Sequence, residues 1–233
     1  MHLFYQPNAS KEPFLSEEES RHCVKTLRLG KGDSISVTDG HGNQFSCVIE
    51  TADPRRCQFR IVDQHAETPR PYSIHLAVAP TKNLDRTEWF IEKAVELGVD
   101  RLSFFIGQHS ERRVLKTDRV EKIAVAAMKQ SLQAYLPQID PLVAFQEILA
   151  LPADQRFLAH LPEGEEKPAS LLRTAKPTGK LLVLIGPEGD FSEKEISAAV
   201  QAGFQMVTLG ATRLRTETAA LAACHILNLL PIL

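Results

Sequence analysis

The sequence predicts an α/β protein in which a small β-rich module precedes a parallel sheet covered on both faces by helices. In the first 65 of the 233 residues, short alternating strands follow one another closely, with turn residues between them. In the rest, apolar strands alternate with amphipathic helices, which is typical of a parallel sheet. A stretch with two prolines, HAETPRPYS at residues 65–73, separates the two parts. We therefore expect one domain over residues 1–68 and a second over residues 73–233.

The N-terminal module contains four strand-like segments and one helix. Turn residues in DGHGN, residues 39–43, predict a hairpin. Ser16 followed by Glu19 is a capping-box pattern, and it predicts the start of a helix over residues 16–30. The strand-like segments are HLFYQ, DSISVTDG, NQFSCVIETA and RCQFRIVDQ. Several short strands with one helix predict a barrel-like module.

The second part predicts five strands and five helices. The expected strands cover residues 73–80, 99–107, 156–161, 180–186 and 205–210. The expected helices cover residues 85–98, 116–133, 141–149 and 192–202, and a last one begins near Thr216. In such open sheets, ligands bind outside the carboxyl ends of the strands, so the loops that follow the strands are the first place to look for chemistry.

Composition limits the class of protein. Hydrophobic residues make up 43% and charged residues 24%, which is an ordinary globular balance, and no apolar run is long enough to span a bilayer. No secretory signal is evident at the N-terminus, so we expect a cytoplasmic protein with reduced, buried cysteines. The eight histidines are scattered, so no metal site is expected. With a net charge of −2, a nucleic-acid partner would need a local basic patch.

Three strand ends carry residues that suit a ligand site: AHLPEG, LIGPEGDFS and LGATRLRTETA. In the second, Gly186 and Gly189 permit a backbone path that side chains would block. Ser192 with Glu195 predicts a capped helix directly after it. A strand-to-helix turn needs glycine and a cap without any ligand, so this loop taken alone favours a purely structural turn.

The third strand end changes this balance. It places Arg213 and Arg215 beside a helix start that Thr216 is expected to cap, and positive charge there favours a nearby anion. The alternative is a salt bridge from Arg215 to Glu188 or Glu217, a kind of surface pair that contributes little. Together the loops favour a ligand site. Dinucleotide and nucleoside-triphosphate sites are disfavoured, because the sequence has neither G-x-G-x-x-G after the strand at 73–80 nor a P-loop.

Basic residues recur at helical spacing in two places, one in each part of the chain. Such a stripe is usually a solvated face, but two stripes fit phosphate contacts better than one. The first comprises Arg21, Lys25 and Arg28, and the second comprises Arg112, Lys116 and Arg119, joined by Arg113 and Lys122. A non-catalytic RNA-binding protein that uses the N-terminal module and these stripes is therefore an alternative to an enzyme.

The paired motifs IGPEGDFSEKE and LGATRLRTETAA resemble those of the ribosomal RNA small subunit methyltransferase E family, in the SPOUT superfamily. FYQP, RHCVKTLRLGKGD, TDGHGNQF, TKNLDRTEWFIEKAVELGVD, SERR and AAMKQSLQAYLPQI agree with it, so the resemblance covers nearly the whole chain. It implies a trefoil-knotted C-terminal domain, a PUA-like β-barrel at the N-terminus and a homodimer. The implied reaction methylates N3 of a uridine in 16S ribosomal RNA within the small subunit, with S-adenosyl-L-methionine as cofactor.

The resemblance also implies site residues. The cofactor would lie among three loops, at residues 159–162, 185–189 and 209–216. The expected cofactor-binding residues are His160, Leu161, Ile185, Gly186, Pro187, Glu188, Gly189, Leu209, Gly210, Leu214 and Thr216. The expected RNA-binding residues are Arg21, Lys25, Arg28, Arg112, Arg113 and Lys116. Arg215 is the candidate for stabilising charge on the uracil, and Glu217 either accepts the N3 proton or orients Arg215.

The chain departs from the family pattern at three places. Asp190 stands where the family commonly has the last glycine of G-P-E-G-G-F, and Thr212 stands where it has an arginine. MKQSLQ replaces a more usual E-Q-S-x-R and so lacks an arginine.

Overall fold

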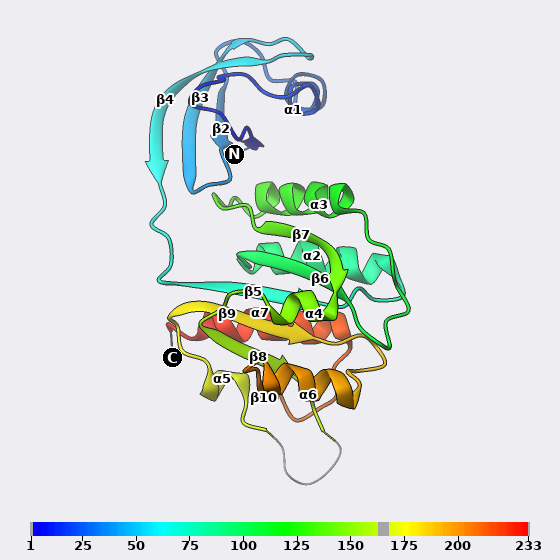
Figure 1. Ribbon diagram of the computed structural model, residues 1–233. Coiled ribbons are helices and arrows are strands. Elements are labelled where there is room, and N and C mark those ends of the chain that lie inside the picture. Colours follow the sequence, from blue (N-terminus) through cyan, green and yellow to red (C-terminus); the bar gives the residue numbers. More distant parts are fainter. Residues whose placement is uncertain (1, 163–167, 233) are drawn as a thin grey trace. The chain divides into compact units, whose positions relative to one another are not determined.

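The computed structural model in Figure 1 describes residues 2–162 and 168–232. The chain forms two compact units, and the first is not continuous in sequence. It comprises Met1–Pro69 together with Val125–Leu136, whereas the second comprises Arg70–Ala124 and Pro137–Leu233. The helices within the described ranges are all too short or too polar to cross a lipid bilayer.

The first unit contains a four-stranded sheet in the order β1-β2-β3-β4. The parallel pair is β1 with β2, while β2–β3 and β3–β4 are antiparallel. The strands are β1 (Leu3–Tyr5), β2 (Ser34–Thr38), β3 (Asn43–Thr51) and β4 (Gln58–Ala66). The expected hairpin is confirmed, since β2 and β3 pair directly on either side of residues 39–42.

The helix of this unit begins as expected but is shorter. The backbone N–H of Glu19 donates to Ser16 Oγ at 3.3 Å, which caps α1 (Glu17–Arg21). The chain then widens into a π-helical turn, η1 (His22–Thr26), and Arg28 adopts a left-handed φ of 57°. A π-turn holds more residues than an α-turn, so the α-helical spacing of side chains ends at Arg21.

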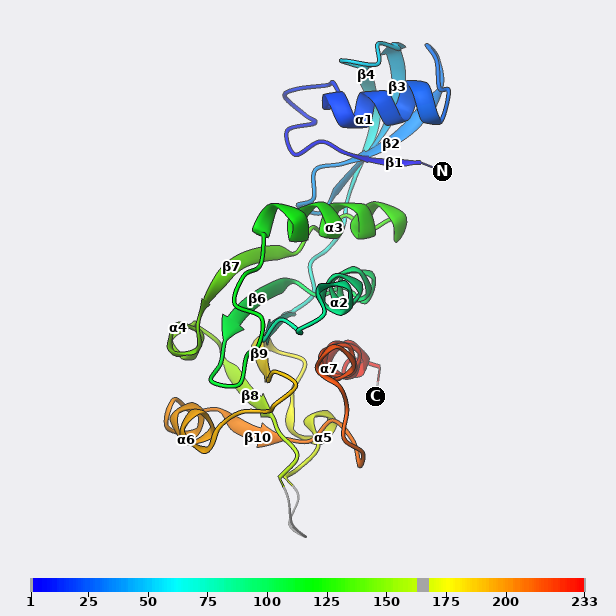
Figure 2. The same ribbon diagram turned by 90° about the vertical axis from the view of Figure 1, so that its right-hand side faces the viewer.

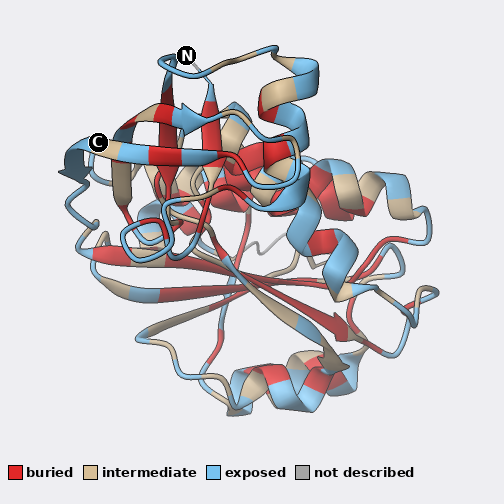
Figure 3. Ribbon diagram, turned by 90° about the horizontal axis from the view of Figure 1, so that it is seen from above, coloured by how far each residue is buried: buried red, intermediate tan, exposed pale blue. Residues whose placement is uncertain are grey.

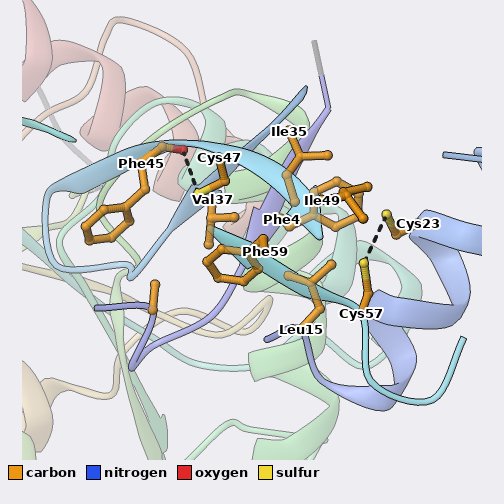
Figure 4. Packing of buried hydrophobic residues seen from close by; sticks show 11 residues of the cluster. Phe4, Leu15, Cys23, Ile35, Val37, Phe45, Cys47, Ile49, Cys57 and Phe59 are labelled. Atoms are coloured by element: carbon orange, nitrogen blue, oxygen red, sulfur yellow. Dashed lines mark hydrogen bonds between the residues drawn. The ribbon is translucent and has the colours of Figure 1, made fainter. Parts of the chain in front are cut away.

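Alternate side chains of the strands form one apolar core, and η1 contributes Cys23 to it (Figure 4). Cys23 and Cys57 lie in it with their Sγ atoms 4.0 Å apart. All four cysteines are free and buried, as expected. Burial raises the pKa of Cys23 and of Cys47 to about 12. Thiols with so high a pKa are inert at neutral pH, and these serve as packing groups.

The segment at residues 125–136 belongs to the first unit through backbone contacts with the β2–β3 hairpin. The carbonyl of Ala134 accepts from the backbone N–H of Gly42 at 3.0 Å and from Thr38 Oγ1 at 3.2 Å. Gly42 has a φ of +96°, and a Cβ at this position would lie 2.4 Å from the Tyr135 ring. Glycine is required here by both conformation and space.

The second unit is built on a six-stranded sheet in the order β10-β8-β9-β5-β6-β7. All five strand pairs are parallel, as expected. The strands are β5 (Tyr72–Val78), β6 (Arg101–Ile106), β7 (Gln138–Ala144), β8 (Gln155–Ala159), β9 (Gly179–Ile185) and β10 (Gln205–Val207). Figure 3 shows the central strands as largely buried, because helices cover both faces.

The helices of the second unit lie on both sides of this sheet, as expected. Figure 2 shows α4 and α6 on one face and α2, α5 and α7 on the other. The helices are α2 (Leu84–Glu96), α3 (Thr117–Gln130), α4 (Phe145–Leu149), α5 (Leu171–Thr174), α6 (Glu193–Gln201) and α7 (Thr216–Leu229). The second half of α3 belongs to the first unit. Ser192 and Glu195 form the expected capping box at the start of α6.

The helix expected over residues 141–149 is wrong in its first half, because β7 runs to Ala144 and α4 begins only at Phe145. Pro141 is the reason. Its position falls in a bulge, since Ile139 pairs with Leu102 but Leu142 pairs with Phe104. An edge strand with a bulge tolerates a residue that has no N–H to donate.

The same bulge places Asp140 in a polar network that spans three neighbouring strands. Asp140 Oδ2 accepts from Arg101 Nε at 2.7 Å and from the hydroxyl of Ser103. Because the Ser103 proton is used in that bond, Ser103 Oγ accepts from His75 Nε2 at 2.7 Å. His75 is therefore held as the neutral Nε2–H tautomer inside the sheet.

Candidate functional site

Three neighbouring strands end at one cavity of about 350 Å³. The strands are β8 (Gln155–Ala159), β9 and β10, and the loops after them form the wall of the cavity together with the start of α7. This is the carboxyl edge of a parallel sheet, where ligands are expected to bind. The volume lies within the range of small-molecule sites, roughly 300–1,000 Å³.

Ten of the eleven residues expected to bind a cofactor line this cavity. They are His160, Leu161, Ile185, Gly186, Pro187, Glu188, Leu209, Gly210, Leu214 and Thr216. Of the segment AHLPEG, Glu163 and Gly164 lie outside the described residues. The structure thus brings together three loops that are separated by up to about fifty residues in sequence.

Gly189 is the expected residue that does not line the cavity. A Cβ at this position would lie 2.9 Å from His109 Cβ, so the glycine allows the loop to pack closely against His109. Gly186 lines the cavity, but a side chain at this position would point away from the cavity. A Cβ on Gly186 would lie 3.0 Å from the ring of Phe191, which belongs to the apolar core beneath the loop. Both glycines are therefore explained by packing within the protein.

Thr216 has a different role from the helix cap expected for it. It is the first residue of α7, and the cap position is held by Arg215, whose side chain makes no capping bond. Thr216 is 6% exposed, and its hydroxyl donates to the carbonyl of Gly186 at 3.0 Å. This bond joins the β9 loop to the β10 loop, so two walls of the cavity are fastened to each other.

Arg213 and Arg215 are both exposed and both line the cavity, which leaves cationic groups beside it. The salt bridge considered between Arg215 and Glu188 or Glu217 is not found among the described residues. Glu188 Oε1 instead accepts from the backbone N–H of Lys82 at 2.9 Å, and Arg112 donates to the Lys82 carbonyl at 2.7 Å. These two bonds connect the loop after β9, which contains Glu188, to the loop after β5 and to Arg112.

Glu217 lies in the first turn of α7 and is 7% exposed. Its Oε1 lies 3.8 Å from Arg86 Nη1 on α2, so within the described part of the chain its ion-pair partner is Arg86 and not Arg215. Its second oxygen, Oε2, is buried without a hydrogen-bond partner among these residues. Glu217 itself does not line the cavity.

The sequence does not predict that His160 and Asp190 form a pair in the cavity wall. His160 Nδ1 lies 3.1 Å from Asp190 Oδ2, and both residues line the cavity. The sequence predicts no role for Asp190, which stands where the family commonly has glycine, and in the structure it has a left-handed φ of 60°. The only sequence signal was an aspartate, which tolerates this conformation, in a loop rich in glycine.

The basic residues do not form the two helical stripes that their spacing predicts. Arg21, Lys25 and Arg28 are exposed, but η1 interrupts the α-helical spacing between them. In the second set, Arg112, Arg113 and Lys116 precede α3 and have no helical geometry. Arg119 is on α3, where it forms a two-point contact with Glu88 at 2.9 and 2.7 Å. Arg113 lines a second cavity, of about 780 Å³, together with Lys194 and Glu147.

Comparison with known proteins identifies both parts of the chain. The model of an RNA methyltransferase domain matches residues 68–228, and that of an RNA methyltransferase PUA domain matches residues 15–62. The probable rRNA-methyltransferase of Porphyromonas gingivalis has a crystal structure that is 41% identical, with a TM-score of 0.91 over 99% of this chain and 98% of that one.

Two relatives carry a more specific name. The ribosomal RNA small subunit methyltransferase E of Aquifex aeolicus is 29% identical over 97% of this chain and 99% of the relative. That of Neisseria gonorrhoeae, solved bound to S-adenosyl methionine, is 29% identical with a TM-score of 0.84 over 96% of this chain and 95% of that one. With a methyltransferase domain over two thirds of its length and a PUA domain before it, the chain belongs to the ribosomal RNA small subunit methyltransferase E family.

Proposed function

We propose that this protein transfers a methyl group from S-adenosyl-L-methionine to N3 of a uridine in 16S ribosomal RNA of the small subunit. The observation that carries the proposal is the single cavity into which three sequence-distant loops bring ten expected cofactor-binding residues. Leu161, Ile185 and Leu209 give it apolar surface, and the loop backbones supply polar groups, which together suit an adenosine with a polar tail.

The protein's part in the reaction is to position the base and to stabilise charge. Bound S-adenosyl-L-methionine supplies an electrophilic methyl group on a sulfonium. Uridine N3 must lose its proton as it attacks, and negative charge then spreads onto the uracil oxygens. Arg215 is the proposed catalytic residue, because a guanidinium beside a cationic cofactor is not needed to attract that cofactor but does stabilise a developing anion. In-line alignment of the two reactants supplies a further part of the rate.

Glu217 is proposed as a positioning residue. It is buried, it is outside the cavity lining, and its ion pair with Arg86 holds the start of α7 against α2. Arg215 immediately precedes α7, so a fixed helix start fixes the backbone from which Arg215 extends. If Glu217 were instead the base that accepts the N3 proton, replacing it would slow methyl transfer as much as replacing Arg215.

The RNA is proposed to contact basic residues of both units, all of which are exposed except Arg112, which is half-buried. Arg21, Lys25 and Arg28 in the first unit, and Arg112, Arg113 and Lys116 in the second, supply cations for phosphates. Replacing the first three by glutamine should weaken binding of small subunits and reduce its salt dependence, while cofactor affinity stays unchanged. A salt slope equal to that of the wild type would show that these residues form only a solvated face.

A homodimer in the cytoplasm is also proposed. The α7 helix is apolar on most sides, and Leu221, Ile226 and Leu229 on it are only half-buried in the monomer. Trp89, on the neighbouring α2, is 48% exposed. A second copy of the chain would cover such a surface. Light scattering that gives the monomer mass of 25.9 kDa at micromolar concentration would refute this.

The decisive experiment is mass spectrometry of 16S ribosomal RNA from a strain that lacks the protein. One uridine should lose its N3 methyl group, and the wild-type gene should restore it while an Arg215→Ala version should not. Calorimetric titration with S-adenosyl-L-methionine separates this enzyme from a non-catalytic RNA-binding protein, which would not bind the cofactor.

A further inference from the structure

We propose that Asp190 fixes the tautomer of His160, so that His160 presents an unprotonated Nε2 as a hydrogen-bond acceptor for the bound cofactor. Asp190 would then be a positioning residue, and His160 a cofactor-binding residue that recognises a hydroxyl or amino group. The inference rests on the proposed function only for the identity of the ligand.

The backbone of Asp190 is held in place on several sides. Its N–H donates to the Pro187 carbonyl at 2.9 Å, and its own carbonyl lies 3.0 Å from His109 Nδ1. Its carboxylate Oδ1 accepts from the backbone N–H of Phe191 at 2.8 Å. The left-handed φ of 60° is costly for most residues, though aspartate tolerates it better. These bonds leave Oδ2 with a defined position at the cavity wall.

His160 is held just as firmly at its backbone. It directly follows β8, and its N–H donates to the Val207 carbonyl of β10 at 3.1 Å. Its side chain is 15% exposed. In the part of the chain that the structure describes, the imidazole makes one hydrogen bond, from Nδ1 to Asp190 Oδ2 at 3.1 Å. The ring therefore cannot turn without breaking that bond.

The chemistry of the pair decides which nitrogen carries the proton. An ionised carboxylate can only accept, so in the neutral imidazole the proton must lie on Nδ1. Nε2 is then an acceptor, and it belongs to a residue that lines the cavity. Hydroxyl and amino groups are donors that match it, and S-adenosyl-L-methionine carries both kinds. The same orientation of an imidazole by a carboxylate is widely used where the free nitrogen must bind a ligand.

The tautomer can be read directly by nitrogen NMR of the full-length protein under mildly alkaline conditions. The wild type should show His160 protonated at Nδ1. In Asp190→Asn, which keeps the side-chain size and suits the left-handed backbone, the amide can donate to Nδ1, and the proton should move to Nε2. A wild-type His160 protonated at Nε2 would overturn the inference without any measurement of activity.

Cofactor affinity tests the second half of the inference through a double-mutant cycle. Asp190→Asn should weaken binding of S-adenosyl-L-methionine about tenfold, as loss of one hydrogen bond does. In a His160→Ala background the same replacement should change affinity less than about twofold, because its effect passes through the imidazole. Asp190→Gly, which removes the carboxylate and relieves the backbone, should also weaken binding and so exclude strain as the cause.

Additive effects of the two replacements, or an unchanged affinity in Asp190→Asn, would refute the role of Asp190. A wild-type protein that fails to bind S-adenosyl-L-methionine would refute the proposed function as well. In that event the NMR measurement would still establish whether Asp190 fixes the His160 tautomer, so the two failures are distinguishable.

Discussion

His75 should make the stability of the protein fall between neutral and mildly acidic pH. Its side chain is 5% exposed at the centre of the six-stranded sheet. Burial lowers its pKa from 6.5 to about 4, the positive charge of Arg101 acts in the same direction, and Asp140 opposes them. The neutral ring already donates its proton to Ser103, so this network does not favour a second proton on His75.

The size of the effect follows from these two pKa values. Between pH 6.5 and about 4, the unfolded chain binds a proton at His75 that the native state does not bind. The free energy of unfolding therefore falls as the pH falls through this range. The full difference corresponds to about 3 kcal/mol, of which about 2 kcal/mol is lost by pH 5.

Urea unfolding of the wild type and of His75→Gln, near pH 7.5 and near pH 5, measures this contribution. Glutamine can still donate to Ser103 but cannot take up a proton. The wild type should lose about 2 kcal/mol more than the variant between the two conditions. His65→Gln, at an exposed position on β4, controls for the loss of a histidine and should retain the wild-type difference. Equal losses in wild type and His75→Gln would refute the reasoning.

The remaining predictions concern the cavity. Arg215→Ala should slow single-turnover methylation of unmodified small subunits, through a loss of about 2.7–4 kcal/mol of transition-state stabilisation, with little change in cofactor affinity. Glu217→Gln should slow the same step less. A near-wild-type rate for Arg215→Ala would exclude Arg215 from the mechanism. Thr216→Val should reduce stability by about 1–3 kcal/mol by leaving the Gly186 carbonyl unpaired, and should weaken cofactor binding, whereas Thr216→Ser should do neither. Gly186→Ala should destabilise the protein by about 1–3 kcal/mol because its Cβ meets Phe191, and adding Phe191→Leu should recover part of the loss in thermal unfolding; no recovery would contradict the assigned contact.

Local and periodic features of the fold were predictable from the sequence. The buried apolar runs of β5 and β9 and the capping box at Ser192 depend on residues close together in the chain, and the structure confirms them. The strand β7 was not predictable by the same means, since Pro141 is tolerated only because of a bulge at a sheet edge. The assignment of residues 125–136 to the first unit depends on contacts with a hairpin some ninety residues earlier, and no local pattern encodes it.

The candidate site was predictable to a similar extent. Loops at the ends of parallel strands must meet at one edge, which explains why ten expected residues share a cavity. The structural role of each individual residue in the site was not predictable from the sequence. Gly186 and Gly189 avoid Phe191 and His109, which come from the loop itself and from a loop after β6. The spacing of Arg21 and Arg28 predicted a shared helical face, but η1 and a left-handed Arg28 lie within it.

The discontinuity of the first unit has a consequence for synthesis on the ribosome. Its sheet is complete at residue 66, but the segment that ends at Leu136 emerges only after β5, α2 and β6 have been made. Synthesis proceeds at roughly 5–20 residues per second, so the backbone partners of Gly40 and Gly42 are synthesised several seconds after the β2–β3 hairpin. The N-terminal sheet therefore matures while the next strands are already leaving the exit tunnel, and a nascent chain stalled before residue 125 should expose that hairpin to proteases and chaperones.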